Sequence, residues 1–66
     1  MDLHRLGTAI LEARTKKKMT QEEVADIAGV SPSTISNMEQ GLHTPTLNML
    51  SAVLPPLDLD PTEFLA

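Results

Sequence analysis

The stretch TQEEVADIAGVSPSTISNMEQG, residues 20–41, decides the fold of this chain. It holds two short segments in which apolar residues recur at helical spacing, and a glycine separates them. Thr20 is placed to cap the first segment, and Glu23, three residues later, completes a capping box. Ser31 is placed to cap the second, with Pro32 at the first helical position, where a missing N–H costs nothing. The stretch therefore predicts two helices joined by a tight turn.

The apolar residues of this stretch predict which side of each helix faces the core. On the first helix they are Val24, Ala25, Ile27 and Ala28, and on the second they are Ile35 and Met38. Gly29, between the helices, suits a helix end that needs a left-handed residue. The opposite side of the second helix carries only hydroxyl and amide groups: Ser33, Ser36, Asn37 and Gln40. These groups either coat a solvated surface or form hydrogen bonds with the edges of DNA bases.

The pattern resembles the helix-turn-helix of the phage repressor and Cro-like regulators, the XRE-like family. The matching residues are Gln21, Val24, Ala25, Gly29, Val30, Ile35, Met38, Glu39 and Gly41, with Arg14 seven positions before Gln21. The resemblance implies an all-α fold, a compact five-helix repressor-like domain in which helices 2 and 3 form the helix-turn-helix. It also implies that the second helix of the motif lies in the major groove of DNA.

The resemblance, together with the polar face, predicts which residues contact DNA. The predicted base contacts are Pro32, Ser33, Thr34, Ser36 and Asn37. The predicted phosphate contacts are Arg14, Lys18, Gln21, Gln40 and Thr44. Arg14 and Glu39 also match a pair that forms a salt bridge in the family, so Arg14 has a structural role, a phosphate-orienting role or both. Pro32 departs from the long polar residue frequent in the family and offers only apolar contact, for example to a thymine methyl group.

The charge of the chain is unevenly distributed. The 66 residues have a net charge of −4, which is unusual for a nucleic-acid-binding protein. All five basic residues lie in the first eighteen positions: Arg5, Arg14, Lys16, Lys17 and Lys18. We therefore expect one basic corner on an acidic body. The alternative for Lys16 to Lys18 is a solvated helix end that favours the helix dipole.

The rest of the chain predicts three more helices. Residues 1–17 carry one apolar stripe after a cap at Asp2, and Gly7 within it either packs closely or weakens the helix by roughly 1 kcal/mol. Thr46 caps a fourth helix that the prolines at 55 and 56 must end. Asp60 caps a last helix of about one turn. Lys18 occupies a position that is frequently glycine in the family, so either the turn differs or a left-handed lysine is tolerated at a cost of about 1 kcal/mol.

Several classes of protein are excluded by what the sequence lacks. It has no cysteine, no glycine-rich phosphate loop, and two histidines without partners at catalytic or metal-ligand spacing. We therefore expect no enzyme, no metal site and no cofactor. No apolar run is long enough to span a membrane, and no signal peptide is evident, so we expect a cytoplasmic protein. The length suits a single domain, residues 1–66, with no room for an effector domain.

The sequence favours a small transcriptional regulator, a repressor, that binds double-stranded DNA as a homodimer on a palindromic operator. The predicted dimer interface is Leu57, Leu59 and Phe64, unless Leu57 and Phe64 close the core together with Leu65 and leave Leu59 exposed. The alternative function is a protein-interaction module, an antitoxin or anti-regulator that kept the fold but lost DNA affinity. The acidic balance supports this alternative and a protein partner.

Overall fold

The computed structural model describes residues 1–65, and in that range helices joined by turns and loops make up the fold and no strand is present. The elements are α1 (Leu3–Lys16), α2 (Gln21–Ala28), α3 (Pro32–Gln40), α4 (Leu47–Val53) and two 3-10 helices, η1 (Pro55–Leu57) and η2 (Pro61–Phe64). The predicted all-α fold is confirmed, but the predicted number of five helices is corrected to four α-helices and two 3-10 turns. The last two segments have only three and four residues. Pro55 lacks the N–H that would continue α4, and η1 ends at Asp58, which has a left-handed φ of 60°.

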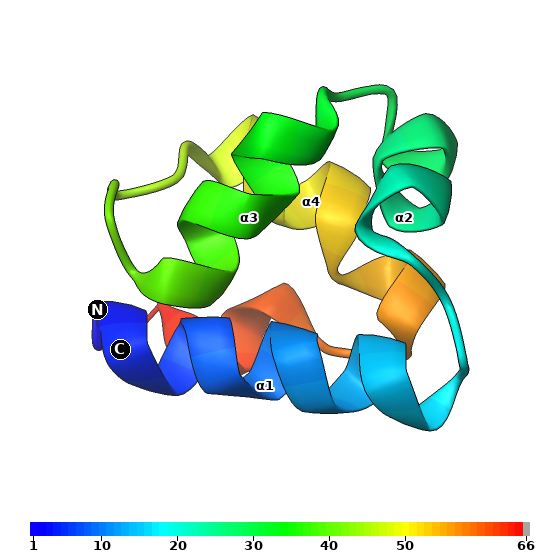
Figure 1. Ribbon diagram of the computed structural model, residues 1–66. Coiled ribbons are helices and arrows are strands. Elements are labelled where there is room, and N and C mark those ends of the chain that lie inside the picture. The colour runs from blue at the N-terminus through cyan, green and yellow to red at the C-terminus, as the bar shows by residue number, and fades with distance from the viewer. Residues whose placement is uncertain (66) are drawn as a thin grey trace.

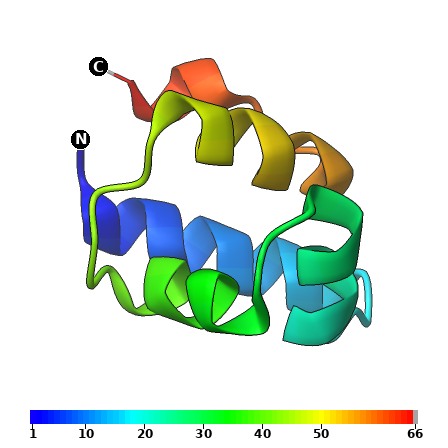
Figure 2. The same cartoon turned by 90° about the horizontal axis from the view of Figure 1, so that it is seen from above.

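The helices form two groups around one apolar core. Figure 1 shows α1 running beneath the other helices, and Figure 2 shows α2 and α3 on one side of it, with α4, η1 and η2 on the other. The core lies between these groups and contains Leu6, Ile10, Val24, Ala25, Ile35, Met38, Leu50, Val53, Leu54, Leu57 and Phe64. α3 is held mainly by α1 and α2. Its polar side therefore remains on the outside of the molecule.

The helix ends follow the predicted local chemistry. Thr20 and Glu23 form the capping box, with Thr20 Oγ1 accepting from the Glu23 N–H at 3.0 Å and Glu23 Oε1 accepting from the Thr20 N–H at 2.9 Å. Ser31 caps α3, and Gly29 and Gly41 end α2 and α3 in the left-handed conformation with φ of 74° and 69°. The caps at the starts of α1, α4 and η2 are also as predicted: Asp2, Thr46 and Asp60.

Gly7 lies where α1 and α3 make their closest approach. A Cβ atom at this position would lie 2.4 Å from the carbonyl oxygen of Glu39 and 2.7 Å from that of Met38. Both distances are well below any real contact between a methyl group and an oxygen. Of the two alternatives for Gly7, close packing or a weakened helix, the structure supports close packing. The absence of a Cβ atom lets α1 lie directly against the backbone of α3.

Two predictions about apolar residues are wrong in detail. Ile27 is 60% exposed and faces away from the core, because it lies about 110° around α2 from the centre of the stripe formed by Val24, Ala25 and Ala28. Leu57 and Phe64, predicted at a dimer interface, are only 2% and 5% exposed and belong to the core.

The burial of Leu57 and Phe64 has a structural reason. The Leu57 N–H donates to the carbonyl of Leu54, so η1 turns back toward the core directly after α4. Phe64 is covered by Arg5, whose guanidinium lies 5.2 Å from the ring centroid and donates to the Glu63 carbonyl at 3.3 Å. The alternative of core closure therefore describes Leu57 and Phe64, but it is wrong for Leu65, which is 50% exposed, and for Leu59, which is half-buried.

Candidate nucleic-acid interface

The recognition face of α3, defined as Ser33, Ser36, Asn37 and Gln40, lies opposite the buried side of the helix. Ile35 is fully buried and Met38 is 3% exposed, so these two side chains orient α3. Ser33 and Gln40 are exposed, whereas Ser36 and Asn37 are half-buried. The first turn also presents Pro32 to solvent.

Some polar side chains at the recognition face already have a hydrogen-bond partner within the protein, and others have none. Gln40 Nε2 donates to Ser36 Oγ at 2.9 Å, and the hydroxyls of Ser31 and Thr34 share a hydrogen bond of 3.0 Å. Ser33 and Asn37 form no side-chain hydrogen bond with any residue that the structure describes. Of the predicted base contacts, these two have the polar groups most available to a ligand.

A network centred on Glu39 joins α1, α2 and α3. Arg14 donates from Nε to Glu39 Oε2 at 2.7 Å and from Nη2 to Oε1 at 3.2 Å, and its Nη1 donates to the Met19 carbonyl at 2.9 Å. Gln21 Nε2 donates to the same Glu39 Oε1 at 2.9 Å. The hydrogen bond to Glu39 raises the pKa of the Arg14 guanidinium, so this charge is permanent. The predicted pairing of Arg14 with Glu39 is present, and the bond from Gln21 adds a partner that the sequence did not reveal.

The start of α2 forms one side of an open hollow of about 470 Å³, which we call the Lys18 hollow. Its lining residues are Arg14, Lys18, Met19, Thr20, Gln21, Glu22 and Pro32. The capping box uses the N–H groups of Thr20 and Glu23, but not those of Gln21 and Glu22. Unpaired N–H groups at a helix start favour an anion such as a phosphate. The structure therefore brings three predicted phosphate-contacting residues together with Pro32 of the recognition helix.

Lys18 adopts the left-handed conformation, with φ of 57°. The turn has thus kept the geometry that is usually provided by glycine, and the lysine tolerates the strain. Its side chain is exposed at the edge of the Lys18 hollow. Lys17, in contrast, is paired with Asp58, with 2.7 Å between Nζ and Oδ2. Among neighbouring lysines, Lys18 is the one placed beside the recognition helix.

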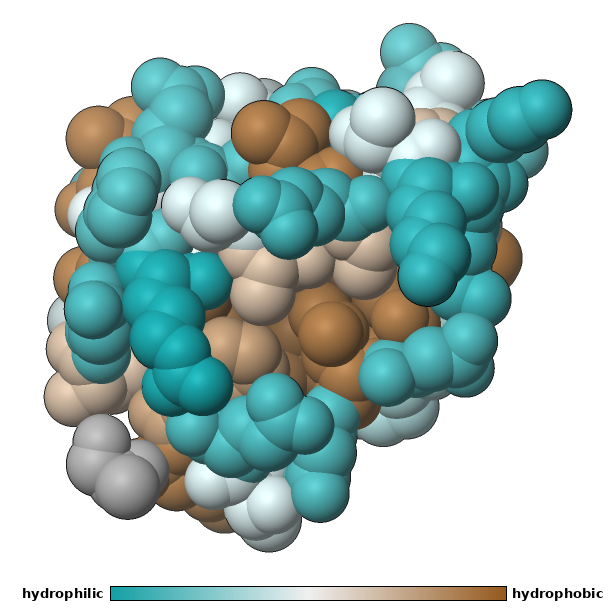
Figure 3. Space-filling model, turned by 90° about the horizontal axis from the view of Figure 1, so that it is seen from below, coloured by the Kyte–Doolittle hydropathy of each residue, from teal (hydrophilic) through white to brown (hydrophobic). Residues whose placement is uncertain are grey.

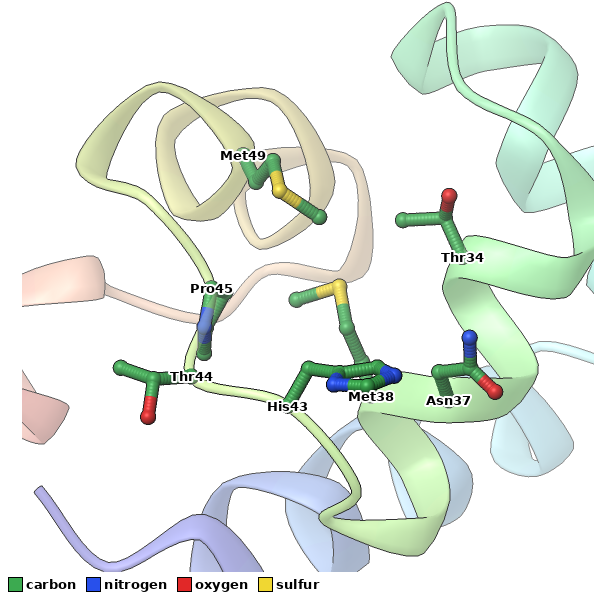
Figure 4. Close-up of a pocket in the computed structure, with 7 residues that line it drawn as sticks. All are labelled: Thr34, Asn37, Met38, His43, Thr44, Pro45 and Met49. Atoms are coloured by element: carbon green, nitrogen blue, oxygen red, sulfur yellow. The ribbon is translucent and has the colours of Figure 1, made fainter.

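A second hollow, which we call the His43 hollow, lies on another side of α3 and has a volume of about 250 Å³. It is lined by Thr34, Asn37 and Met38 of α3, by His43, Thr44 and Pro45 of the following loop, and by Met49 of α4 (Figure 4). Thr44, a predicted phosphate contact, therefore lies close to two predicted base contacts. Sequence reasoning assigned no role to His43, because only the fold brings it beside Asn37.

The described residues show neither a metal site nor a membrane helix. No group of three or more histidine, cysteine, aspartate or glutamate side chains in residues 1–65 is arranged to hold a metal ion. Within the same residues, no helix has the length and apolar character needed to cross a membrane.

Comparison with known proteins identifies the fold and the family. A family model described as helix-turn-helix matches residues 10–64. The structure is similar to that of the restriction-modification controller protein C.AhdI from Aeromonas hydrophila, with 31% identity, a TM-score of 0.84 and 94% of each chain covered. No curated protein sequence matched the chain.

Two further similar structures are also regulators. SinR, the master regulator for biofilm formation, was solved in complex with DNA; it has 31% identity and a TM-score of 0.80, with 92% of this chain and 98% of that chain covered. The clp gene regulator ClgR from Corynebacterium glutamicum has 28% identity and a TM-score of 0.82, with 92% of this chain and 65% of that chain covered. The matched family is one of non-enzymatic regulators, in agreement with the sequence prediction of no enzyme. The chain thus belongs to the XRE-like helix-turn-helix family of DNA-binding transcription regulators.

Proposed function

We propose that this protein binds double-stranded DNA sequence-specifically, as a homodimeric transcription regulator, and that it represses from a palindromic operator. The observation that carries the proposal is the recognition face, where Ser33 and Asn37 remain unbonded between two hollows that contain predicted phosphate contacts. The structure of SinR with DNA, at 31% identity, supports duplex DNA as the partner. The similar structures from Aeromonas hydrophila and Corynebacterium glutamicum come from bacteria, in which the chromosome lies in the cytoplasm, so the proposal places the protein there.

The roles within the site follow from the chemistry of each group. Asn37 has a donor and an acceptor on one amide, which matches the N6 and N7 edge of adenine in the major groove. Ser33 bonds to several bases, and Pro32 contributes apolar contact. Lys18, Gln21 and the start of α2 bind one phosphate, while Thr44 binds another beyond the far side of α3. Arg14 and Glu39 hold Gln21 in position for the first phosphate.

The dimer surface that we propose surrounds Leu59, which is half-buried. This residue lines a third hollow with Ala13, Lys16, Lys17, Leu57 and Asp58, and this hollow shares no lining residue with the two beside α3. Figure 3, which views the molecule from the side of α1, shows an apolar centre edged by hydrophilic side chains. The edge has two lysines and an aspartate, so a two-fold axis at this surface can bring Lys16 of one copy toward Asp58 of the other.

Binding to duplexes selected from a random library tests the proposal, with affinities measured by fluorescence anisotropy. Asn37→Ala should cost about 1–3 kcal/mol on the selected site and little on other duplexes, whereas Lys18→Ala should weaken binding to all duplexes alike. Asn48→Ala, the same change on exposed Asn48 of α4, is the matched control and should leave the preference unchanged. An unaltered site preference in Asn37→Ala would count against α3 as the recognition helix.

The dependence on salt provides a second test of the same proposal. Few cations face the site, since Lys17 is paired with Asp58 and Arg14 with Glu39. With Lys18 and at most Lys16 of each subunit left to neutralise phosphates, a dimer should show a slope of roughly −2 to −4 in log affinity against log salt concentration. A slope steeper than about −10 would mean that many more cations contact phosphates than this assignment allows.

A protein-interaction module remains the second candidate, and the net charge of −4 favours it. SinR, a similar structure, was also solved as a complex with SinI. Phosphate contacts are strongest at low salt. If the protein binds no duplex under those conditions, the protein-interaction module becomes the favoured function.

A further inference from the structure

His43 is the titratable residue of the His43 hollow, in the loop between α3 and α4. Its side chain is exposed, and Figure 4 shows the imidazole beside Asn37 and Met38 of the recognition helix. Thr44, the predicted phosphate contact, is the next residue in the chain and lines the same hollow. The proposed phosphate contact therefore lies in the loop that also carries the imidazole.

The surroundings of His43 hold no competing charge among the described residues. Those that line the hollow are threonine, asparagine, methionine and proline, contributed by α3, by the loop and by α4. The acid closest in the sequence, Glu39, has its carboxylate bonded to Arg14 and Gln21 on the side of α3 that faces α1 and α2. No ion pair with His43 is present within residues 1–65. The charge of this imidazole is thus free to respond to a ligand.

The charge distribution of the chain makes this position unusual. Every lysine and arginine lies at or before Lys18, and from Met19 onward His43 is the only side chain that can become positive. The Lys18 hollow contains the cations Arg14 and Lys18, whereas neither lysine nor arginine lines the His43 hollow. A histidine provides a positive charge only when it binds a proton, which happens within the pH range from about 5 to about 8.

We propose that DNA binding promotes the protonation of His43 in each subunit, so that affinity for the duplex rises as the pH falls from about 8 to about 6. The inference rests on the proposed DNA binding. A phosphate beside an imidazole favours its charged form, and the added proton comes from the solvent. Since the bound state holds more protons than the free state, mass action makes the association constant increase at lower pH. The protein would thereby bind its operator more tightly when the cytoplasm becomes more acidic.

The test measures the dissociation constant on the duplex that the wild-type protein prefers, at fixed ionic strength, from pH 6 to pH 8. The wild-type affinity should increase by roughly fivefold for each bound subunit as the pH falls across this range. His43→Gln should remove most of this increase while its affinity at pH 8 stays close to that of the wild type. His4→Gln, which alters the only other histidine of the chain, is the matched control and should keep the full dependence.

Two further measurements separate a charge effect from a structural one. His43→Lys, with a fixed charge, should bind at pH 8 about as tightly as the wild type does at pH 6 and should show little dependence on pH. Calorimetry at pH 7 in two buffers of different protonation heat should count roughly a third to a half of a proton taken up per subunit, and none for His43→Gln. Circular dichroism checks that each variant remains folded.

The outcomes of this test are distinct. A wild-type affinity that is independent of pH, or a dependence that persists in His43→Gln, would overturn the inference and leave the proposed DNA binding intact. Absence of duplex binding by the wild type at every pH would overturn the proposed function itself.

Discussion

Arg14 of α1 and Glu39 of α3 form a two-bond ion pair, with Nε 2.7 Å from Oε2 and Nη2 3.2 Å from Oε1. Both side chains are largely buried, with exposed fractions of 16% and 7%. Gln21 bonds to the same carboxylate, so one acid connects the first helix, the start of the second and the end of the third. This geometry makes the pair a support for both the fold and the phosphate site.

Removal of the acid alone should be severe. Glu39→Leu leaves the guanidinium of Arg14 buried without its partner and should cost about 3 kcal/mol in the free energy of unfolding, measured with urea. The double variant, Arg14→Met with Glu39→Leu, should lose less than the sum of the two single variants, since neither charge is then unpaired. Additive losses would show that the two residues do not act as a pair.

The close contact at Gly7 predicts that a methyl group there is harmful. Gly7→Ala gains up to about 1 kcal/mol of helix propensity, but it forces α1 and α3 apart and should cost about 1–3 kcal/mol overall. Thr15→Ala, on the exposed side of the same helix, is the control and should be neutral or slightly stabilising in thermal unfolding. A melting temperature for Gly7→Ala at or above that of the parent would contradict the contact.

The left-handed conformation of Lys18 predicts that stability and DNA affinity respond in opposite directions. Lys18→Gly removes strain of about 1 kcal/mol, partly offset by the greater freedom of glycine in the unfolded chain, and so should stabilise the fold by a few tenths of a kcal/mol. It should also weaken binding to all duplexes, because the cation of the Lys18 hollow is lost. Lys18→Ala removes the same charge without relieving the strain, so equal stability of the two variants would argue against strain at this position.

Two exposed aspartates predict a loss of stability in acid. A hydrogen bond from Lys17 lowers the pKa of Asp58, and a hydrogen bond from the Thr62 backbone N–H lowers the pKa of Asp60. Since both groups bind protons less readily when folded, their contribution is complete above the ordinary value of 3.8 and is lost as the pH falls through the lower folded values.

Asp60→Asn keeps an oxygen that caps η2 but removes the titration. The variant should therefore show a weaker decrease of melting temperature between pH 4 and pH 2. The same change at Asp26, an exposed aspartate of α2 outside both contacts, is the control. If the melting temperature decreases equally in Asp60→Asn and in the parent, Asp60 does not contribute to the loss of stability in acid.

The proposed dimer surface predicts a selective defect for Leu59→Glu. The variant should fold with unchanged helicity, because Leu59 is only half-buried, but it should lose cooperative binding to a palindromic duplex. Ile27→Glu alters an exposed apolar residue that lines none of the three hollows and should keep that cooperativity. Cooperative binding that is as strong in Leu59→Glu as in the parent would place the interface elsewhere.

The sequence alone determined the ends of the helices and the identity of the helix-turn-helix. The caps at Thr20, Ser31 and Thr46 and the left-handed glycine at 29 depend on hydrogen bonds between residues a few positions apart. Such bonds are set by local chemistry, so residue type and spacing suffice to predict them. The pairing of Arg14 with Glu39 came from the resemblance to a family, and the structure contains it.

Only the tertiary structure decided how these elements meet. The burial of Leu57 and Phe64, the outward side chain of Ile27 and the close approach at Gly7 depend on contacts between helices that are distant in the sequence. The same is true of His43, whose place beside the recognition helix depends on how the loop to α4 packs. A pattern of apolar residues specifies that a side of a helix is buried, but the neighbour that covers it is chosen by the packing of the whole core.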